Sequence, residues 1–409
     1  MNLQRALTPV FKRAATGTVI NSGGLFSLFG STTTKNGTAV NQNSALTLSA
    51  FYNAVDIISN DYAKLPKGVF QKTNNGREKR SKHNLQYLIS TKPNQYMTSF
   101  MFDKMIIAHA ILKGNGYAII ERHPNTAAPV ALQLVDQNKT PVTVIKYDNG
   151  LFYKVGESLI AAEDMYHIPG FSLNGITGIS VISYAAISLG TALSSQEFAS
   201  DYYKAKGIGT AVVTSAKSIE PDGKIRLANA LNARLNETGD WKTVVLDETG
   251  SFQHIKITPQ EAQFLTTNKY AIAEVARWLN IPVHKLKDNS DTNNSISENQ
   301  ELMYAADSIV PWARKNEQEA NCKLFTKAEQ KDGYYIKANI GALLQSDKKT
   351  QAEFFSKLIF SGVYTRNEVR NLLDMNSIDG LDAPLTPVNA QTMEQINTKL
   401  KELESKINA

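Results

Sequence analysis

Two long helical patterns, separated by a small mixed block, limit the possible folds of this chain more than any other feature. The first runs almost unbroken through residues 178–207, and about 28 helical residues at 1.5 Å each form a rod roughly 40 Å long. Ala, Ser and Gly are frequent along it, and small side chains let a neighbouring helix approach closely. The second, residues 259–279, carries one apolar stripe of Ile272, Val275, Ala276 and Leu279. We expect a hairpin of two long helices.

The block between these helices, residues 208–257, has the order strand, helix, strand pair. Its basic and acidic residues roughly cancel, so we do not expect it to be the nucleic-acid surface. A small αβ lobe at the end of a helical hairpin is suited to docking another protein.

The second helix has clear start and stop signals and leads into a polar loop. Thr258 suits the N-cap, Pro259 the first helical position, and Glu261 completes a capping box. Pro282 stops the helix, and residues 283–294 are then rich in Asn, Ser, Asp and Thr. Such a loop could be a disordered linker, a metal-binding or catalytic loop, or a loop that contacts a polyanion.

A third helix is expected after this loop, because Ser295 and Glu298 form a second capping box. Pro311 lies inside the helical pattern, where a proline removes a backbone hydrogen bond and bends the helix axis. The bend is either purely structural or a joint that positions the loop.

The flanking segments indicate an α+β chain. Helices are expected at "LTLSAFYNAVDIISNDYAKLP" and "TSFMFDKMIIAHAILKG", and strands at "KGVFQK", "YAIIERH", "MYHIPG" and "YYIKAN". Residues 1–44 contain no acidic residue, and we expect a flexible basic arm there. Thr365 and Glu368 form a third capping box. Apolar residues at 3-4-3-4 spacing near the C-terminus predict a short coiled-coil-like seam: Met393, Ile396, Leu400, Leu403 and Ile407.

Composition excludes several classes of protein. The formal charge of +6 and the pI of about 9.0 permit contact with nucleic acid without demonstrating it. One cysteine excludes an intramolecular disulfide, and the six histidines show no HExxH or paired Cys/His spacing, so we expect no metal site. No apolar run approaches the roughly 20 residues that span a bilayer, and we expect no membrane partner.

The sequence contains no recognisable catalytic motif. The chain has no GxxxxGK[ST] phosphate loop and no GxSxG elbow. "KGNGYA" at residues 113–118 follows a helix and precedes a strand, the reverse of a dinucleotide-binding loop, so it predicts a turn. His167 has no evident base or orienting acid nearby, and His284 is interpreted as a surface-loop histidine. We therefore expect no enzymatic activity and no cofactor.

Several of these segments, in this order, resemble the portal proteins of tailed bacteriophages with HK97-type capsids. They are "LSAFYNAVDIISNDYAKLP", "KPNQYMTSFMF", "LKGNGYAII", "HIPGFSLNGITGIS", "SFQHIKITPQEAQFLTTNKYAIAEVARWLNIPVHKL", "SIVPWARKNEQEANCKLF" and "SGVYTRNEVRNLLDM". The resemblance extends from residue 45 to about 389. Each segment alone is weak, and the ordered set is specific, with "RWLNIPVHKL" the most telling part together with the G-x-Y-T-R-N-E-V-R pattern.

The resemblance implies a phage portal fold of α+β class, with named parts. These are a flexible basic arm (1–44), a wing (45–177), a first stem helix (178–206), a clip (207–258), a second stem helix (259–280), a tunnel loop (281–295), a bent wing helix with its return strand (296–341), and a crown with the C-terminal helix (342–409).

The resemblance also implies a function and partners. The chain would form a ring, expected to be a dodecamer, at one capsid vertex, after assembly in the host cytoplasm. Double-stranded DNA would pass through the ring during packaging and ejection, without sequence-specific contacts. The major capsid protein, the terminase and head–tail connector proteins would bind it. Candidate clip residues for partner docking are Lys224, Arg226, Arg234 and Trp241, and the candidate hinges are Pro282 and Pro311.

The candidate DNA-facing residues lie in the tunnel loop. Lysines can interact with phosphates without reading bases, and asparagines offer weak hydrogen bonds that reorient as DNA moves. The candidates are Lys285, Lys287, Asn289, Asn293 and Asn294. Alternatively, these lysines pair with Asp288 and Asp291 and face away from the channel.

Two other functions stay open at this point. One is a capsid or connector assembly protein without a DNA channel, which would form a narrow ring or none. The other is an enzyme acting on DNA, which the absence of a phosphate loop and of a metal-ligand cluster makes the weakest alternative.

Overall fold

A computed structural model describes the chain in two compact units, residues 1–340 and 341–409, which are treated separately below. The described residues are 18–20, 39–74, 76–204, 211–215, 220–223, 225–226, 229, 250–254, 264–287, 300–344, 348–373 and 375–385.

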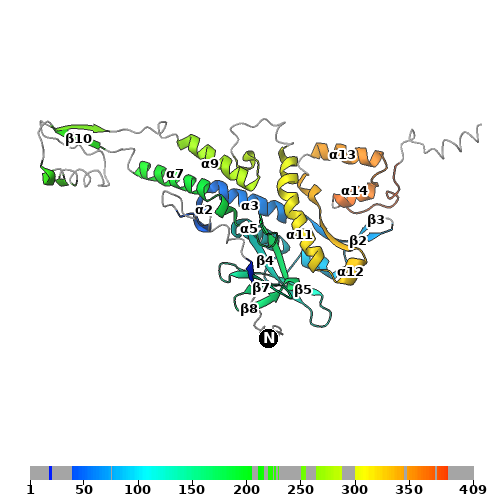
Figure 1. Cartoon of the computed structure of the whole chain (residues 1–409). Coiled ribbons are helices and arrows are strands. Elements are labelled where there is room, and N and C mark those ends of the chain that lie inside the picture. Colours follow the sequence, from blue (N-terminus) through cyan, green and yellow to red (C-terminus); the bar gives the residue numbers. More distant parts are fainter. Residues whose placement is uncertain are drawn as a thin grey trace, which may run out of the picture. The chain divides into compact units, whose positions relative to one another are not determined.

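The first unit contains a group of packed helices and several antiparallel sheets. Helices α3 (Ser49–Ala63) and α5 (Ser99–Lys113) lie side by side (Figure 1). The expected helical stripe of α3 is buried, because Phe51, Val55, Ile58 and Tyr62 recur on one face of the helix. The shorter helices α2 (Gln42–Thr47) and α4 (Asn84–Ser90) pack against α3 and α5 respectively.

Three antiparallel sheets complete the main body of this unit. The first contains β12 (Tyr334–Ala338), β2 (Lys67–Thr73) and β3 (Gly76–Lys79), so "YYIKAN" returns to pair with a strand near the start of the chain. The second has the order β5 (Pro129–Leu134), β4 (Asn115–Arg122), β9 (Met165–Pro169). The third has the order β1 (Thr18–Ile20), β6 (Val142–Tyr147), β7 (Gly150–Val155), β8 (Ser158–Ala161). The short helix η2 (Ala162–Asp164) connects β8 to β9.

The expected flexible arm at residues 1–44 is corrected at several positions. Thr18–Ile20 form the edge strand β1, which pairs antiparallel with β6. Asn41 caps α2, which begins at Gln42. Thr18–Ile20 form a strand because β6 offers free backbone groups to an added strand, which a composition argument does not reveal. Most of the arm lies outside the described residues.

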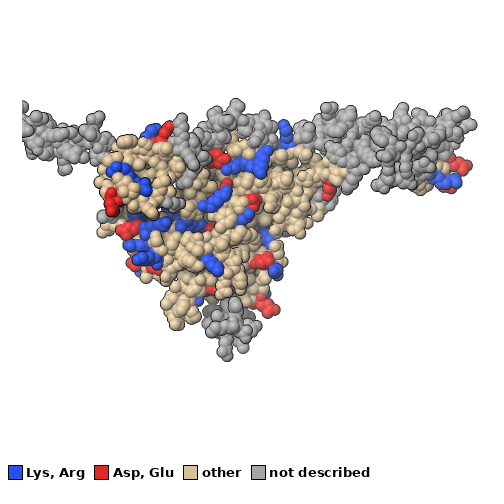
Figure 2. Space-filling model, turned by 180° about the vertical axis from the view of Figure 1, so that it is seen from behind, with Lys and Arg blue, Asp and Glu red and all other residues tan. Residues whose placement is uncertain are grey.

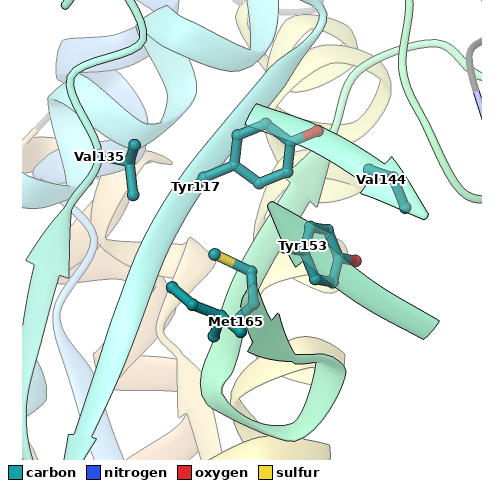
Figure 3. Close-up of a cluster of buried hydrophobic side chains, with 6 residues drawn as sticks. Tyr117, Val135, Val144, Tyr153 and Met165 are labelled. Atoms are coloured by element: carbon teal, nitrogen blue, oxygen red, sulfur yellow. The ribbon is translucent and has the colours of Figure 1, made fainter. Parts of the chain in front are cut away.

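One apolar cluster joins the second and third sheets. Figure 3 shows Tyr117, Val135, Val144, Tyr153 and Met165 gathered together, and Ile160 is buried with them. The rings of Tyr117 and Tyr153 meet edge to face, with centroids 5.8 Å apart. Because these residues come from strands of both sheets, the cluster fixes one sheet against the other.

The expected helical hairpin is confirmed. Helices α6 (Val181–Tyr184) and α7 (Ala186–Lys204) make up the first helical segment of the hairpin, with Ser180 as N-cap and a one-residue interruption at Ala185. Helix α9 (Phe264–Leu279) packs against α7 (Figure 1). The Ser188 hydroxyl on α7 accepts from the Trp278 indole at 3.3 Å and donates to Glu274 at 3.2 Å. The expected capping box at Thr258 lies outside the described residues.

The block between the stem helices contains a two-stranded antiparallel sheet of β10 (Ala211–Ser215) and β11 (Gly250–His254). This pairing agrees with the strands expected at either end of the block. Most of the intervening segment lies outside the described residues.

The third helical pattern is interrupted where Pro311 predicted a bend. Residues 300–304 are helical, Ala305–Ile309 form the π-helix η4, and α11 (Val310–Lys323) follows with Pro311 in its first turn. A π segment inserts an extra residue into the turn, and such segments often mark functional positions. Helix α12 (Lys327–Lys331) then leads into β12.

The second unit contains η5 (Ile340–Leu344) at its boundary, α13 (Lys348–Phe360) and α14 (Arg366–Leu372). The predicted capping box is present, since Thr365 and Glu368 exchange hydrogen bonds at the start of α14. Gly362 has the left-handed φ of 74° expected of a residue that ends a helix. The C-terminal seam, residues 386–409, lies outside the described residues. No helix in the described ranges is long and apolar enough to cross a membrane.

Candidate functional site

The two ends of the polar loop form the candidate site. The short helix η3 (Val283–Leu286) follows Pro282 and ends at Lys287, and the chain is described again from Gln300. Asn289, Asn293 and Asn294 lie outside the described residues, together with Asp288 and Asp291. The geometry of the site therefore comes from the residues that flank the loop.

Lys285 points into the protein rather than away from it. Its Nζ lies 2.7 Å from Oε2 of Glu301 and 3.9 Å from Oδ2 of Asp61, and its side chain is 21% exposed. The same ammonium lies 4.6 Å from the centre of the Tyr304 ring. Lys285 thus binds carboxylates on α3 and on the far side of the loop.

Asp61 contacts three other side chains of this network. Its side chain, on α3, accepts a hydrogen bond from the Tyr304 hydroxyl at 3.0 Å and pairs with Lys64 at 2.8 Å. Burial, and next the neighbouring Asp61 carboxylate, raise the pKa of the Tyr304 hydroxyl well above its ordinary value, so the hydroxyl remains a donor. Lys285 and Tyr304 therefore tie the two ends of the loop to one carboxylate.

Glu301 joins the loop ends directly. One carboxylate oxygen holds Lys285, and the other lies 3.2 Å from Nε2 of His284. His284 was interpreted as a surface-loop residue, but its side chain is only 14% exposed, because Glu301 and the adjoining helices cover it. We name the set of Asp61, His284, Lys285, Glu301 and Tyr304 the loop anchor.

Lys287 has a different environment. It is exposed, adopts a left-handed φ of 63°, and donates its backbone N–H to the His284 carbonyl at 3.0 Å. Among the described residues, no carboxylate lies within ion-pair distance of its ammonium. Of the two candidate lysines, Lys285 is the one that pairs with carboxylates of the described residues.

The remaining candidate residues are only partly placed. Arg226 is exposed, and its Nε donates to the Asp222 carbonyl at 3.3 Å, so its guanidinium is accessible. Lys224, Arg234 and Trp241 lie outside the described residues. Pro282 precedes η3 and Pro311 follows the π-helix, so both prolines stand at breaks in helical structure.

The two glycine-rich segments, around Gly114 and around Gly178, pack against each other. A Cβ on Gly178 would lie 1.9 Å from the Gly114 carbonyl oxygen, and one on Gly116 would lie 2.3 Å from the Ile106 carbonyl oxygen. Asn115 bridges the segments through its Oδ1, which accepts from the Gly178 N–H at 2.7 Å. Glycine is needed here for close backbone packing, as the predicted turn requires, and not for a phosphate cradle.

His167 belongs to the same junction. Its ring nitrogens lie 3.0 Å from the Tyr153 hydroxyl and 2.9 Å from Asn115 Oδ1. Burial lowers the pKa of His167 to about 3, so its ring is neutral near pH 7. Both ring nitrogens have partners within the fold, so His167 is a packing residue of strand β9.

The described ranges show no metal cluster, and the one face seen in Figure 2 carries charges of both signs. They contain no group of three or more His, Cys, Asp or Glu residues that could hold a metal ion. On the face seen in Figure 2, Lys and Arg are interspersed with Asp and Glu. Such a surface does not favour tight binding of a polyanion over its whole area.

Sequence reasoning missed three members of the loop anchor. Asp61, Glu301 and Tyr304 are ordinary helix residues in the sequence, and Asp61 is separated from the others by about 240 positions. No spacing rule connects them, so only the packing of α3 against η3 and the π-helix brings them together.

Comparison with known proteins gives consistent results. A family model described as phage portal protein matches residues 49–374. The chain is 28% identical over 365 residues to the probable portal protein of Streptomyces phage phiC31, covering 84% of this chain and 78% of that protein. It is 24% identical over 369 residues to the portal protein of Enterobacteria phage HK97, covering 85% and 83%.

Solved structures agree in fold. A HK97-family phage portal protein from Corynebacterium diphtheriae has a TM-score of 0.57 at 13% identity, with 76% of this chain and 99% of that chain covered. A chain in the neck of a native gene transfer agent particle, computed with C12 symmetry, has a TM-score of 0.52 at 15% identity, with 81% and 93% covered. These likenesses support the mixed α+β fold.

Proposed function

The chain belongs to the phage portal protein family, and we propose that it forms a ring at one capsid vertex through which double-stranded DNA passes during packaging and ejection. The family match over residues 49–374 supports the portal function. The C12 symmetry of the similar neck structure supports a ring of twelve subunits. The observation that carries the conduit is the loop anchor, because it ties both ends of one polar loop to each other and to Asp61 on α3.

The same proposal assigns the parts of the chain. The three sheets with α3 and α5 correspond to the wing, and α7 with α9 to the stem. The β10–β11 lobe corresponds to the clip, where the exposed Arg226 is available for docking the terminase and the connector proteins. The second unit corresponds to the crown. The protein would reside in the virion after assembly in the host cytoplasm, in contact with the major capsid protein, as a structural component and not as an enzyme.

We propose separate roles for the two lysines of the loop. Lys287 faces the DNA, since its ammonium is exposed and has no carboxylate partner in the described residues. Lys285 acts one step behind it, holding the loop in place through Glu301 and Asp61. One cation per subunit gives a weak phosphate contact that is independent of sequence, which suits a wall along which DNA must slide.

Electron microscopy of the purified full-length protein tests the ring. We expect closed rings with a central hole wide enough for a DNA duplex. A monomer under all conditions, with or without capsid protein, contradicts the proposal. A closed ring too narrow for a duplex favours the alternative, an assembly protein of the capsid or connector without a DNA channel.

Lys287→Ala tests the contact with DNA. We expect the variant to form normal rings and to bind DNA with a weaker salt dependence. The slope of the logarithm of the binding constant against the logarithm of the salt concentration should fall by about one for each subunit whose phosphate contact is lost. Binding is measured by titrating rings with short duplexes at several salt concentrations. Lys139→Ala removes an exposed wing lysine as the matched control and should change nothing. An unchanged slope in Lys287→Ala contradicts the assignment.

A further inference from the structure

The end of stem helix α9 is built around Asn280. This residue has a left-handed φ of 52°, and the N–H groups of Asn280 and Ile281 donate to the carbonyls of Arg277 and Ala276 at 3.3 and 2.9 Å. Ile281 and Ala276 are both buried. This is a Schellman motif, in which glycine is the usual residue at the left-handed position. Asparagine tolerates that position less well than glycine, which raises the question of what its side chain does there.

The interrupted helix supplies the answer. In a continuous α-helix the carbonyl of Asp307 would accept from the N–H of residue 311, which is a proline and has none. The chain passes this point as a π-helix, in which the Val310 N–H donates to the Ala305 carbonyl. The side chain of Asn280 donates its Nδ2–H to the Asp307 carbonyl at 3.2 Å. The amide thus satisfies the carbonyl that Pro311 leaves without its helical donor.

A second hydrogen bond runs in the opposite direction. The Ser308 hydroxyl donates to the Asn280 backbone carbonyl, which is free because the helix has ended there. The end of α9 and the π segment therefore exchange hydrogen bonds, side chain to backbone in each direction. The Asn280 carbonyl lies past the end of α9, and the Asp307 carbonyl lies where Pro311 removes the α-helical donor.

We propose that Asn280 is a positioning residue that locks the end of stem helix α9 to the π segment of the bent helix and so sets the path of the loop that leaves both. The chain runs from Asn280 through η3 to Lys287, and it re-enters at Gln300 just before the π segment. A fixed junction at Asn280 and Asp307 therefore fixes where both loop ends point. The consequence for DNA passage rests on the proposed function, whereas the junction itself does not.

A double-mutant cycle tests the junction. Asn280→Gly keeps the left-handed turn and removes only the amide, and Pro311→Ala restores an N–H that can donate to the Asp307 carbonyl. In the parent background we expect Asn280→Gly to raise the unfolding equilibrium constant by up to about fivefold, the effect of one lost hydrogen bond less the gain of glycine in the left-handed turn. In the Pro311→Ala background the same change should have little effect or be stabilising, since glycine prefers the left-handed turn. Equal effects in both backgrounds overturn the proposal.

A distance measurement separates positioning from simple stabilisation. Spin labels at Lys287→Cys and Met303→Cys, two exposed sites on either side of the loop, are introduced with Cys322→Ser, which removes the exposed native thiol. We expect one narrow distance distribution for Asn280 and a broader or shifted one for Asn280→Gly under conditions where both proteins are folded. An unchanged distribution means that Asn280 only caps its helix, and it overturns the positioning role. Because this readout needs neither rings nor DNA, it is independent of whether the chain conducts DNA.

Discussion

Replacing Gly178 by alanine is expected to lower the free energy of unfolding by roughly 3 kcal/mol, at the upper end of overpacking effects. The added Cβ would lie 1.9 Å from the Gly114 carbonyl oxygen and 2.6 Å from the Gly170 nitrogen. Both contacts are with backbone atoms, so no side chain can rotate away to make room. The loss should appear in urea denaturation as a lower midpoint with an unchanged slope.

Gly175 provides the control within the same segment. It has a left-handed φ of 74°, and a Cβ there would meet nothing within 4 Å. Gly175→Ala should therefore cost about 1 kcal/mol from backbone strain alone. If Gly178→Ala is no more destabilising than Gly175→Ala, the backbone of Gly178 does not lie as close to Gly114 and Gly170 as described.

Lys285→Ala is expected to lower the free energy of unfolding by about 2 kcal/mol, because the buried Asp61 carboxylate and the partly exposed Glu301 carboxylate both lose a cation. Glu301 loses a partner at 2.7 Å and Asp61 one at 3.9 Å, and the contact with the Tyr304 ring is lost as well. Thermal or urea denaturation of the full chain measures the loss. Lys285→Met keeps an apolar side chain of similar length and removes only the charge. Its free energy of unfolding should fall nearly as much as that of Lys285→Ala, because the loss comes from the charge.

Lys287→Ala is the matched control for the anchor. Its side chain is exposed, so stability should stay within error of the parent protein even though the same charge is removed two residues along the chain. If instead Lys285→Ala leaves stability unchanged and weakens DNA binding by rings, Lys285 faces the channel and the loop anchor is incorrectly assigned. The pair of variants thus distinguishes an anchoring lysine from a DNA-facing lysine.

Local signals predicted much of the fold. The ends of α14 and α5 follow from residues that contact their own backbone: Thr365 with Glu368 at one start, Thr98 at the other, and Gly114 at the end of α5. The buried stripe of α3 follows from its period. The second long helix was expected to end at residue 279, and α9 does end at Leu279, although the turn there is made by Asn280 in the left-handed conformation and not by Pro282.

Long-range contacts were not predictable in the same way. The sequence offered two partners for Lys285, DNA phosphates or the nearby aspartates, whereas the structure places it against Glu301 and Asp61. It marked Pro311 as a bend without indicating that Asn280 would satisfy the Asp307 carbonyl. The strand at Thr18–Ile20 depends on the free edge of β6, more than a hundred residues away.

By itself the sequence determined the helices, their caps, the polar loop and the membership of the portal family, because each depends on residues close in the chain or on a pattern repeated along it. The tertiary structure alone decided which way the loop lysines point. Lys285 turns inward because packing of α3 against η3 and the π-helix brings Asp61 and Glu301 within reach of its ammonium, and an ammonium taken partly out of water is stabilised by carboxylates. Lys287, beyond the end of η3, remains in solvent.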